Sequence, residues 1–221
     1  MAKTTDKVLN DPQIGEVVFR KSTRSRSIGI RVHPLKGVSV TFPYILPYAA
    51  AQAYFYLRRD WVLETMARQK DRYKDVNIPS ETEIEALRRQ AKKVLPSRLS
   101  ELALRYGFVY NRVTIKHNAS NWGSCSSKKN INLNLNIVRL PAVLQDYVLL
   151  HELCHLRHQD HGTAFHLLLE HVLTDNLMKL MDEAGPDAGL VSELARKAAV
   201  SKARYPLDYV ITREIRKYHL V

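Results

Sequence analysis

Hydrophobic and polar residues alternate along two early stretches of the chain, a pattern that predicts β-strands. SIGIRV (27–32) and VSVTF (38–42) both show this period of two, and the turn HPLKG between them joins them into a hairpin. From about Pro47 to Lys70 the apolar residues recur at helical spacing instead. The pattern therefore predicts a β-rich segment over residues 17–43 that leads into helices.

A long helix is predicted over the next apolar repeat, within residues 81–107. Ser80 stands where a helix cap is expected, and Gly107 is well placed to end the helix. Pro96 is expected to kink this helix or to begin a new turn. The apolar residues that recur at helical spacing include Ile84, Leu87, Ala91, Val94 and Leu95.

The period returns to two after this helix. VTIKHN (113–118) and NINLNLNIV (130–138) are predicted to be strands joined by the loop ASNWGSCSSKK. The second strand places its isoleucines and leucines on one face and its asparagines on the other. That asparagine face is interpreted in two ways, as an edge strand that an extended peptide could join or as a solvated polar face.

Two further helices are predicted in the second half of the chain. Pro141 is suited to the first turn of a helix that runs through Tyr147 into His151. A second helix is expected to start near Thr163, after Gly162, because a stripe of apolar residues follows at helical spacing. The segment after residue 185 is rich in alanine and charge, and more helix is expected there.

These patterns predict an α+β fold in four parts. Residues 1–15 are expected to be a flexible N-terminus, and residues 16–110 a basic part with a β-hairpin and helices. Residues 111–175 are expected to form the catalytic part and residues 176–221 a helical C-terminal extension. With 221 residues, of which 45% are hydrophobic, the chain can build a core without disulfides or other cross-links.

Positive charge is concentrated in the first half of the chain. The formal net charge is +12, and residues 1–120 carry 22 Lys and Arg against 11 Asp and Glu, while residues 121–221 carry 12 against 11. Arg20, Lys21, Arg24 and Arg26 form the densest cluster. Such a field favours a polyanionic partner such as a nucleotide or nucleic acid, and a solvated basic face is the alternative.

The sequence contains no secretory signal pattern and no apolar run approaching the roughly 18 residues of a membrane span. Cys125 and Cys154 are too few for a disulfide framework. We therefore expect a cytoplasmic protein that does not contact membranes. Its two cysteines are expected to be buried thiols, with soft metal ligands or a redox pair as the alternatives.

Candidate chemistry is concentrated in HELCHLRHQDHGTAF (151–165). On a helix, His151 and His155 lie one turn apart on the same face and can meet one zinc ion at roughly 2.0–2.1 Å. Glu152 lies about 100° around the helix, close enough to act on a metal-bound water without being a ligand. This pattern indicates a metal site with a general base; the alternative is a packed helix rich in histidine.

Two histidines compete to be the third ligand. His158 would extend the row of His151 and His155 along one helix face, and a straight row surrounds an ion poorly. His161 stands beside Gly162, where the chain can turn back, so it would approach from another direction. We therefore expect His161 to be the ligand and His158 to be solvated or to support a ligand.

Several other residues near this stretch have a functional and a structural interpretation. Trp122 is interpreted either as a wall of the active site or as a core residue, and the serines of WGSCS as hydrogen-bond donors to substrate. His166 and His171 are predicted to be surface or structural residues.

Five short motifs follow one another along the second half of the chain: WGSCS (122–126), INLN (131–134), LP (140–141), DYVLLHELCHL (146–156) and HGTAF (161–165). In this order and spacing the sequence resembles the YgjP-like (DUF45) family of zinc metallopeptidases. The resemblance extends over roughly residues 17–175. It implies a zincin-like catalytic half in which His151, His155 and His161 bind Zn²⁺ and Glu152 is catalytic.

The sequence therefore predicts a zinc hydrolase that acts on a peptide or protein substrate. Glu152 would take a proton from the metal-bound water and return it to the leaving nitrogen. Two alternatives stay open. One is a metal-dependent nucleotide phosphoanhydride hydrolase that uses the basic Arg20–Arg26 cluster, and the other is a nucleic-acid-associated protein with a structural metal.

Overall fold

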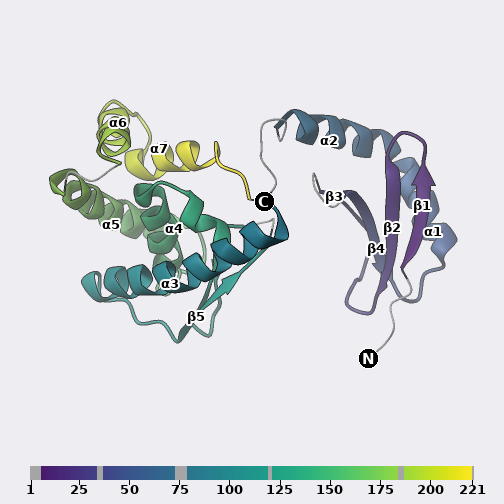
Figure 1. The fold of residues 1–221 in the computed structure, drawn as a ribbon, viewed down its shortest axis with the longest axis horizontal. Coiled ribbons are helices and arrows are strands. Elements are labelled where there is room, and N and C mark those ends of the chain that lie inside the picture. The colour runs from purple at the N-terminus through teal and green to yellow at the C-terminus, as the bar shows by residue number, and fades with distance from the viewer. Residues whose placement is uncertain (1–5, 34–36, 73–78, 119–120, 184–186, 221) are drawn as a thin grey trace. The chain divides into compact units, whose positions relative to one another are not determined.

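The computed structural model describes residues 6–33, 37–72, 79–118, 121–183 and 187–220 (Figure 1). The chain forms two compact units, Met1–Asn77 and Ile78–Val221. The sequence placed a boundary at residues 110 and 111 instead. The difference arises because the long helix before that boundary buries Leu95, Leu99 and Leu102 in the core of the second unit.

The N-terminal unit is a four-stranded sheet with two helices. Its elements are β1 (Lys7–Asp11), β2 (Gly15–Ser22), β3 (Gly29–His33), β4 (Gly37–Pro43), α1 (Tyr48–Leu57) and α2 (Arg59–Arg72). The strand order is β1-β2-β4-β3; β2 and β4 are parallel, and the two outer strands are antiparallel to their neighbours. Phe55 of α1 and Val62 of α2 join the buried residues of the sheet in one apolar core.

Strand β1 lies within the segment that was expected to be flexible, so order begins earlier than the sequence indicated. The strand pairs with β2 along its whole length, and Leu9 packs against the core. Asp11 at its end accepts hydrogen bonds from the side chain of Arg59 and from the backbone N–H groups of Gln13 and Ile14. The pattern KVLND shows no clean alternation, so periodicity alone did not reveal it.

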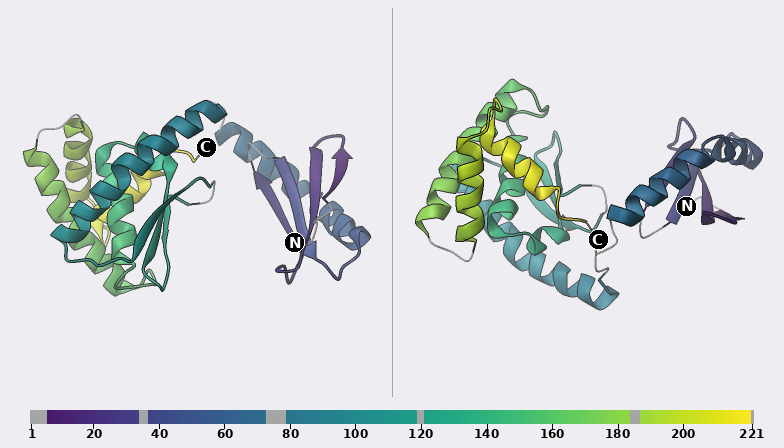
Figure 2. Two further views of the ribbon diagram at one scale, coloured as in Figure 1. Left: turned by 60° about the horizontal axis from the view of Figure 1, so that its bottom comes forward. Right: turned by 90° about the horizontal axis from the view of Figure 1, so that it is seen from above.

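The C-terminal unit packs helices around a small sheet. Its elements are α3 (Glu81–Arg105), β5 (Arg112–Lys116), β6 (Gly123–Cys125), β7 (Asn130–Asn134), the 3-10 helix η1 (Leu135–Arg139), α4 (Ala142–Cys154), α5 (Thr163–Asp182), α6 (Ala188–Ala199) and α7 (Pro206–Ile215). Helix α4 packs on β6, on α3 and on the C-terminal helices α5 and α7, so it lies at the centre of the unit (Figure 2). None of the described helices is long and apolar enough to cross a membrane.

The signals for the long helix are confirmed at both ends. The Ser80 hydroxyl accepts a hydrogen bond from the N–H of Glu83, whose carboxylate accepts one from the N–H of Ser80. This reciprocal capping box starts α3, and Gly107, with a φ of +66°, follows its end. The helix is continuous across Pro96.

The predicted strand 130–138 is only half correct. It ends at Asn134, whose side-chain oxygen accepts a hydrogen bond from the N–H of Asn136 and so caps the 3-10 helix η1. The expected loop 119–129 contains strand β6, which pairs with β7. Because the sheet order is β5-β7-β6, β7 is the central strand and not an edge that a peptide could join.

Candidate metal centre

Helix α4 carries the first two residues of the site, His151 and Glu152, in its last turn, and His155 follows directly as its C-terminal cap. The sequence DYVLLHELC is buried at almost every position, because α4 is surrounded by other elements of the unit. A helix packed on several sides holds its side chains in fixed directions. The imidazoles of His151 and His155 therefore stand on a rigid support, with ring centres 4.9 Å apart.

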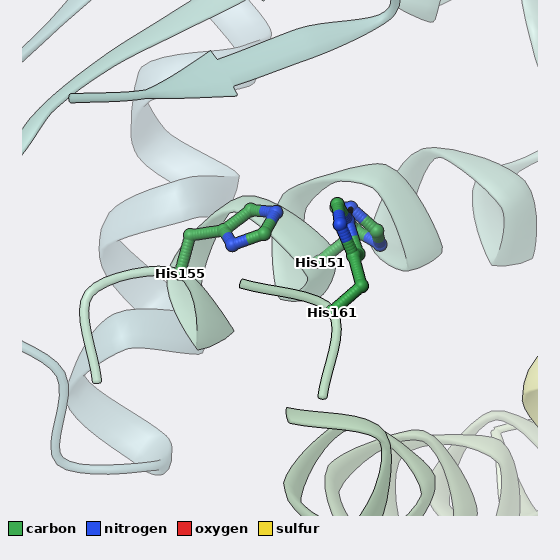
Figure 3. A group of neighbouring side chains, drawn as sticks. All are labelled: His151, His155 and His161. Atoms are coloured by element: carbon green, nitrogen blue, oxygen red, sulfur yellow. Dashed lines mark hydrogen bonds between the residues drawn. The ribbon is translucent and has the colours of Figure 1, made fainter. Parts of the chain in front are cut away.

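His161 lies beside these two histidines (Figure 3). One nitrogen from each of the three rings falls within 4.8 Å of the others, and Nε2 of His161 is 3.1 Å from Nε2 of His151. Nitrogens that bind one tetrahedral zinc ion at roughly 2.0–2.1 Å are about 3.3 Å apart. The geometry brings together the three histidines that the sequence singled out, at a spacing that suits one small ion.

Phe165 holds the three imidazoles in place from one side. It is fully buried on α5, where it stacks on His155 with a ring distance of 4.5 Å. Its ring centre lies 5.0 and 4.8 Å from those of His151 and His161, in edge-to-face arrangements. The chain turns at Gly162, so α5 starts just after His161 and places Phe165 beneath the cluster. The HGTAF segment thus contributes both a ring of the cluster and its apolar support.

The environment keeps the histidines of α4 in the neutral form that metal binding requires. Burial, together with the neighbouring imidazoles, lowers the pKa of His151 to about 3. Burial also lowers the pKa of His155. The Nδ1–H of His155 donates to the backbone carbonyl of His158 at 3.0 Å, which leaves Nε2 of His155 as the free nitrogen. The backbone of His158 thus orients a ring of the cluster, and its side chain lies outside the cluster.

Glu152 is buried beside the histidines without a polar partner for one oxygen. The residue is 5% exposed, and its Oε2 has no hydrogen-bond partner among the described residues. Burial raises the pKa of Glu152 to about 8. An uncompensated buried carboxyl group costs free energy, so it is rarely kept without a task. Nδ1 of His151 is likewise buried without a partner in the part of the chain that the structure describes.

Strand β6 passes directly over Glu152 at Gly123. A Cβ built on Gly123 would lie 2.6 Å from Oε1 of Glu152, which is closer than real Cβ contacts allow. The glycine of WGSCS is therefore needed for space, since any side chain there would push the carboxylate aside. The sequence quoted this glycine only as part of a motif, and nothing local revealed its contact with Glu152.

The asparagine face of β7 is occupied by internal hydrogen bonds. Nδ2 of Asn132 donates to Oγ of Ser124 at 3.1 Å, and Nδ2 of Asn134 donates to the carbonyls of Asn118 and Asn121. These bonds hold the residues around β6 against the central strand. The asparagines support the sheet, and neither a peptide-binding edge nor a solvated face describes them.

The remaining candidates lie outside the histidine cluster. Cys154 is buried and burial raises its pKa to about 12, while burial also raises the pKa of the half-buried Cys125. Among the described residues, the group suited to a metal contains the three histidines and neither cysteine. Trp122 is partly buried against the core, and its carbonyl accepts a hydrogen bond from the N–H of Asn134.

His166 lies closer to the cluster than the sequence suggested. Its ring centre is 6.4 Å from that of His161, and its Nδ1 is 2.7 Å from a carboxylate oxygen of Asp208 on α7. The other carboxylate oxygen of Asp208 accepts hydrogen bonds from Tyr147 and Thr212. The C-terminal extension therefore reaches the edge of the site, a contact across 42 residues that no local pattern announces.

Comparison with known proteins gives one family. Residues 79–179 match the family described as YgjP-like, metallopeptidase domain, which confirms the resemblance over that segment. A comparison with curated proteins gave no significant match. The solved structure of the metallopeptidase zymogen abylysin from Pyrococcus abyssi aligns with 41% of this chain and 95% of its own, at 19% identity and a TM-score of 0.33.

Proposed function

We propose that residues 79–179, the segment that matches the YgjP-like metallopeptidase family, carry a zinc-dependent peptidase site. His151, His155 and His161 are the proposed metal ligands, and Glu152 is the proposed general base. The observation that carries this proposal is the convergence of three ring nitrogens within 4.8 Å of one another, beside the buried Glu152, whose Oε2 has no partner among the described residues. The same residues form the HExxH pattern with a third histidine, which is used by zinc hydrolases.

The donor set suits zinc better than a hard cation. Three neutral imidazoles are borderline-soft nitrogen ligands, and Mg²⁺ or Ca²⁺ prefers oxygen ligands. Three protein ligands also leave a fourth position open, which distinguishes a catalytic zinc site from a closed structural one. This argument disfavours the alternative of a purely structural metal.

Zinc, when bound, supplies Lewis-acid chemistry that acidifies a water molecule and polarises a carbonyl group. Glu152 accepts the proton of the attacking water at its free Oε2 and later donates that proton to the leaving nitrogen. Burial favours the protonated carboxyl group, and a nearby cation favours the carboxylate, so Glu152 can serve in both directions. Phe165 and the backbone of His158 keep the imidazoles oriented.

The test is cleavage of a mixed peptide library by the purified full chain with one equivalent of zinc, read by mass spectrometry. We expect cleavage that a chelator abolishes and that added zinc restores. Phosphate release from a parallel panel of nucleoside triphosphates distinguishes phosphoanhydride hydrolysis from peptide hydrolysis. Phosphate release without any peptide cleavage would contradict the peptidase proposal and select phosphoanhydride hydrolysis.

The basic cluster upstream is less available for a polyanion than its composition suggests. The guanidinium of Arg20 makes three hydrogen bonds to the carboxylate of Asp6, with distances of 2.6 to 3.1 Å. This arginine is therefore partly neutralised within the N-terminal unit. The nucleotide and nucleic-acid alternatives lose one of the residues on which they rested.

A further inference from the structure

A solvent-open cavity lies beside His166, on the side of α7. Its volume is about 300 Å³, and its lining comes from His166 and from residues 203–216 of the C-terminal extension. Residues 203–216 follow the segment that matches the family, which ends at residue 179. The lining of this cavity is therefore contributed almost entirely by a part of the chain to which no role has been assigned.

Three exposed arginines give the cavity its charge. Arg204, Arg213 and Arg216 all line it, and none of them has an ion pair among the described residues. Two lysines on the same surface behave differently, because Lys197 and Lys217 are each ion-paired to a glutamate three or four residues earlier. The cavity thus gathers three cationic side chains that have no ion pair in the described part of the chain.

The one carboxylate in the lining makes no ion pair with these arginines in the described part of the chain. Asp208 is 7% exposed, and both of its oxygens are engaged, one by His166 and the other by Tyr147 and Thr212. The same cavity is lined by Tyr205, whose buried hydroxyl has no hydrogen-bond partner in the described part of the chain. The cavity therefore offers guanidinium donors, and the oxygens of its one carboxylate already accept hydrogen bonds from other residues.

Aromatic rings hold two of the guanidinium groups at the cavity. Arg213 donates to the hydroxyl of Tyr209 at 2.9 Å, and Arg204 lies 5.5 Å from the ring centre of Tyr205. Stacked or hydrogen-bonded guanidinium groups lose less conformational entropy when they bind an anion. A planar guanidinium matches a carboxylate with two parallel hydrogen bonds.

We propose that this cavity, the arginine pocket, binds a carboxylate of the peptide substrate close to the bond that is cleaved. The inference rests on the proposed peptidase function and adds a substrate class to it. His166 connects the two sites, since it lines the arginine pocket and its ring centre lies 6.4 Å from that of His161. A peptide held at the histidine cluster can therefore place a neighbouring acidic group against the arginines. The carboxylate comes from an acidic side chain or from the free C-terminus.

The first experiment measures kcat/KM for matched peptides that differ only by Glu or Gln at each position flanking the cleaved bond. We expect the Glu peptide to be preferred by roughly tenfold at one position, because hydrogen bonds to charged groups are the stronger ones. Salt should reduce this preference. Free and amidated forms of the same peptides separate the two sources of the carboxylate.

The triple variant Arg204→Gln/Arg213→Gln/Arg216→Gln should reduce the Glu/Gln ratio to near one. The control is Arg196→Gln/Lys202→Gln, which removes two exposed cations outside the arginine pocket and should keep the ratio. Zinc content and the thermal midpoint of each variant verify that it is folded. An unchanged ratio in the folded triple variant would overturn the proposal.

A second measurement keeps the two proposals distinguishable. The same peptides are titrated by fluorescence anisotropy against the zinc-loaded Glu152→Gln variant, which should bind peptides without cleaving them. If peptides are cleaved with equal kcat/KM for Glu and Gln, the proposal of the arginine pocket is wrong and the proposal of the peptidase stands. If the Glu peptide binds preferentially but the wild type cleaves no peptide, the proposal of the arginine pocket stands and the proposal of the peptidase is wrong.

Discussion

Each of the two units buries a carboxyl group, and the two groups differ in their hydrogen-bond partners and in the direction of their pKa shifts. Asp11 in the N-terminal unit is 6% exposed and Glu152 in the C-terminal unit is 5% exposed, so their burial is alike. Asp11 accepts two hydrogen bonds from Arg59 and two from backbone N–H groups. The bonds from Arg59 hold the pKa of Asp11 well below its usual range, whereas burial raises the pKa of Glu152 to about 8.

The same contrast occurs within a single helix. Asp146, six residues before Glu152 on α4, receives two hydrogen bonds from Arg98 at 2.7 and 2.5 Å and one from Asn176 at 2.9 Å. Its position is as buried as that of Glu152. The C-terminal unit therefore does provide partners for a buried acid. The absence of a described partner for Oε2 of Glu152 is a local feature of the histidine cluster.

The comparison teaches that burial alone does not identify a functional acid. A buried carboxylate with every partner in place ties elements together, and removing it should cost stability. A buried carboxyl group without a partner lowers the stability of the free protein. Such a group is a candidate for a functional role, so removing it should lower activity.

The largest expected effect is that of Glu152→Gln. Glutamine keeps the size of the side chain and cannot accept a proton, so we expect peptide cleavage to fall roughly a thousandfold. Zinc content should be unchanged, and thermal stability should not fall, because a buried carboxyl group is removed. Residual cleavage near the wild-type rate would refute the role of general base.

Gly123→Ala should have the next largest effect. The added methyl group would lie 2.6 Å from Oε1 of Glu152, so the carboxylate must shift, and a displacement of about 1 Å costs roughly a hundredfold in rate. Zinc content should be retained. Gly189→Ala is the matched control, since a Cβ there meets nothing within 4 Å, and it should leave the rate unchanged.

Asp146→Asn should lower stability without removing zinc. The variant leaves the guanidinium of Arg98 without its partner on α4, and breaking such a pair costs about 3 kcal/mol. Urea unfolding followed by Trp122 fluorescence in a Trp61→Phe background reports the C-terminal unit alone, because the chain has two tryptophans. A loss of zinc from the folded variant would contradict the assignment of Asp146 to structure.

Acid should weaken the N-terminal unit through Asp11. Its folded pKa lies below the unfolded value of about 3.9, so its contribution is complete above about pH 5 and is lost as the pH falls. Asp11→Asn should cost about 2 kcal/mol at pH 7, and less at pH 3. Trp61 fluorescence in a Trp122→Phe background measures the unfolding of this unit. A difference in unfolding free energy between the proteins with and without the Asp11→Asn substitution that stays constant with pH would contradict the assignment.

Local signals in the sequence predicted the ends of the long helix and the three histidines that lie together. The capping residue Ser80, the ending residue Gly107 and the repeat of α3 depend on neighbours within a few positions, so the sequence shows them directly. His151, His155 and His161 lie within one turn of helix and one loop, and the structure brings their rings together. Their role as metal ligands is the proposal above.

Contacts between segments far apart in the chain could not be predicted from such local signals. Gly123 meets Glu152 across 29 positions, and Arg59 meets Asp11 across 48. The alternation of NINLNLNIV also predicted too long a strand, because the side chain of Asn134 caps a 3-10 helix and overrides the period. Periodicity reports which face of an element is apolar, and it does not report which element will lie against that face.

The most direct test is the metal content of the full chain and of its His161→Ala variant, purified without chelator or histidine tag and measured by inductively coupled plasma mass spectrometry. We predict about one zinc ion per chain in the wild type and a large loss in the folded variant. If zinc is absent from the wild type even after zinc is added, or is held equally by the variant, the three-histidine metal site is wrong.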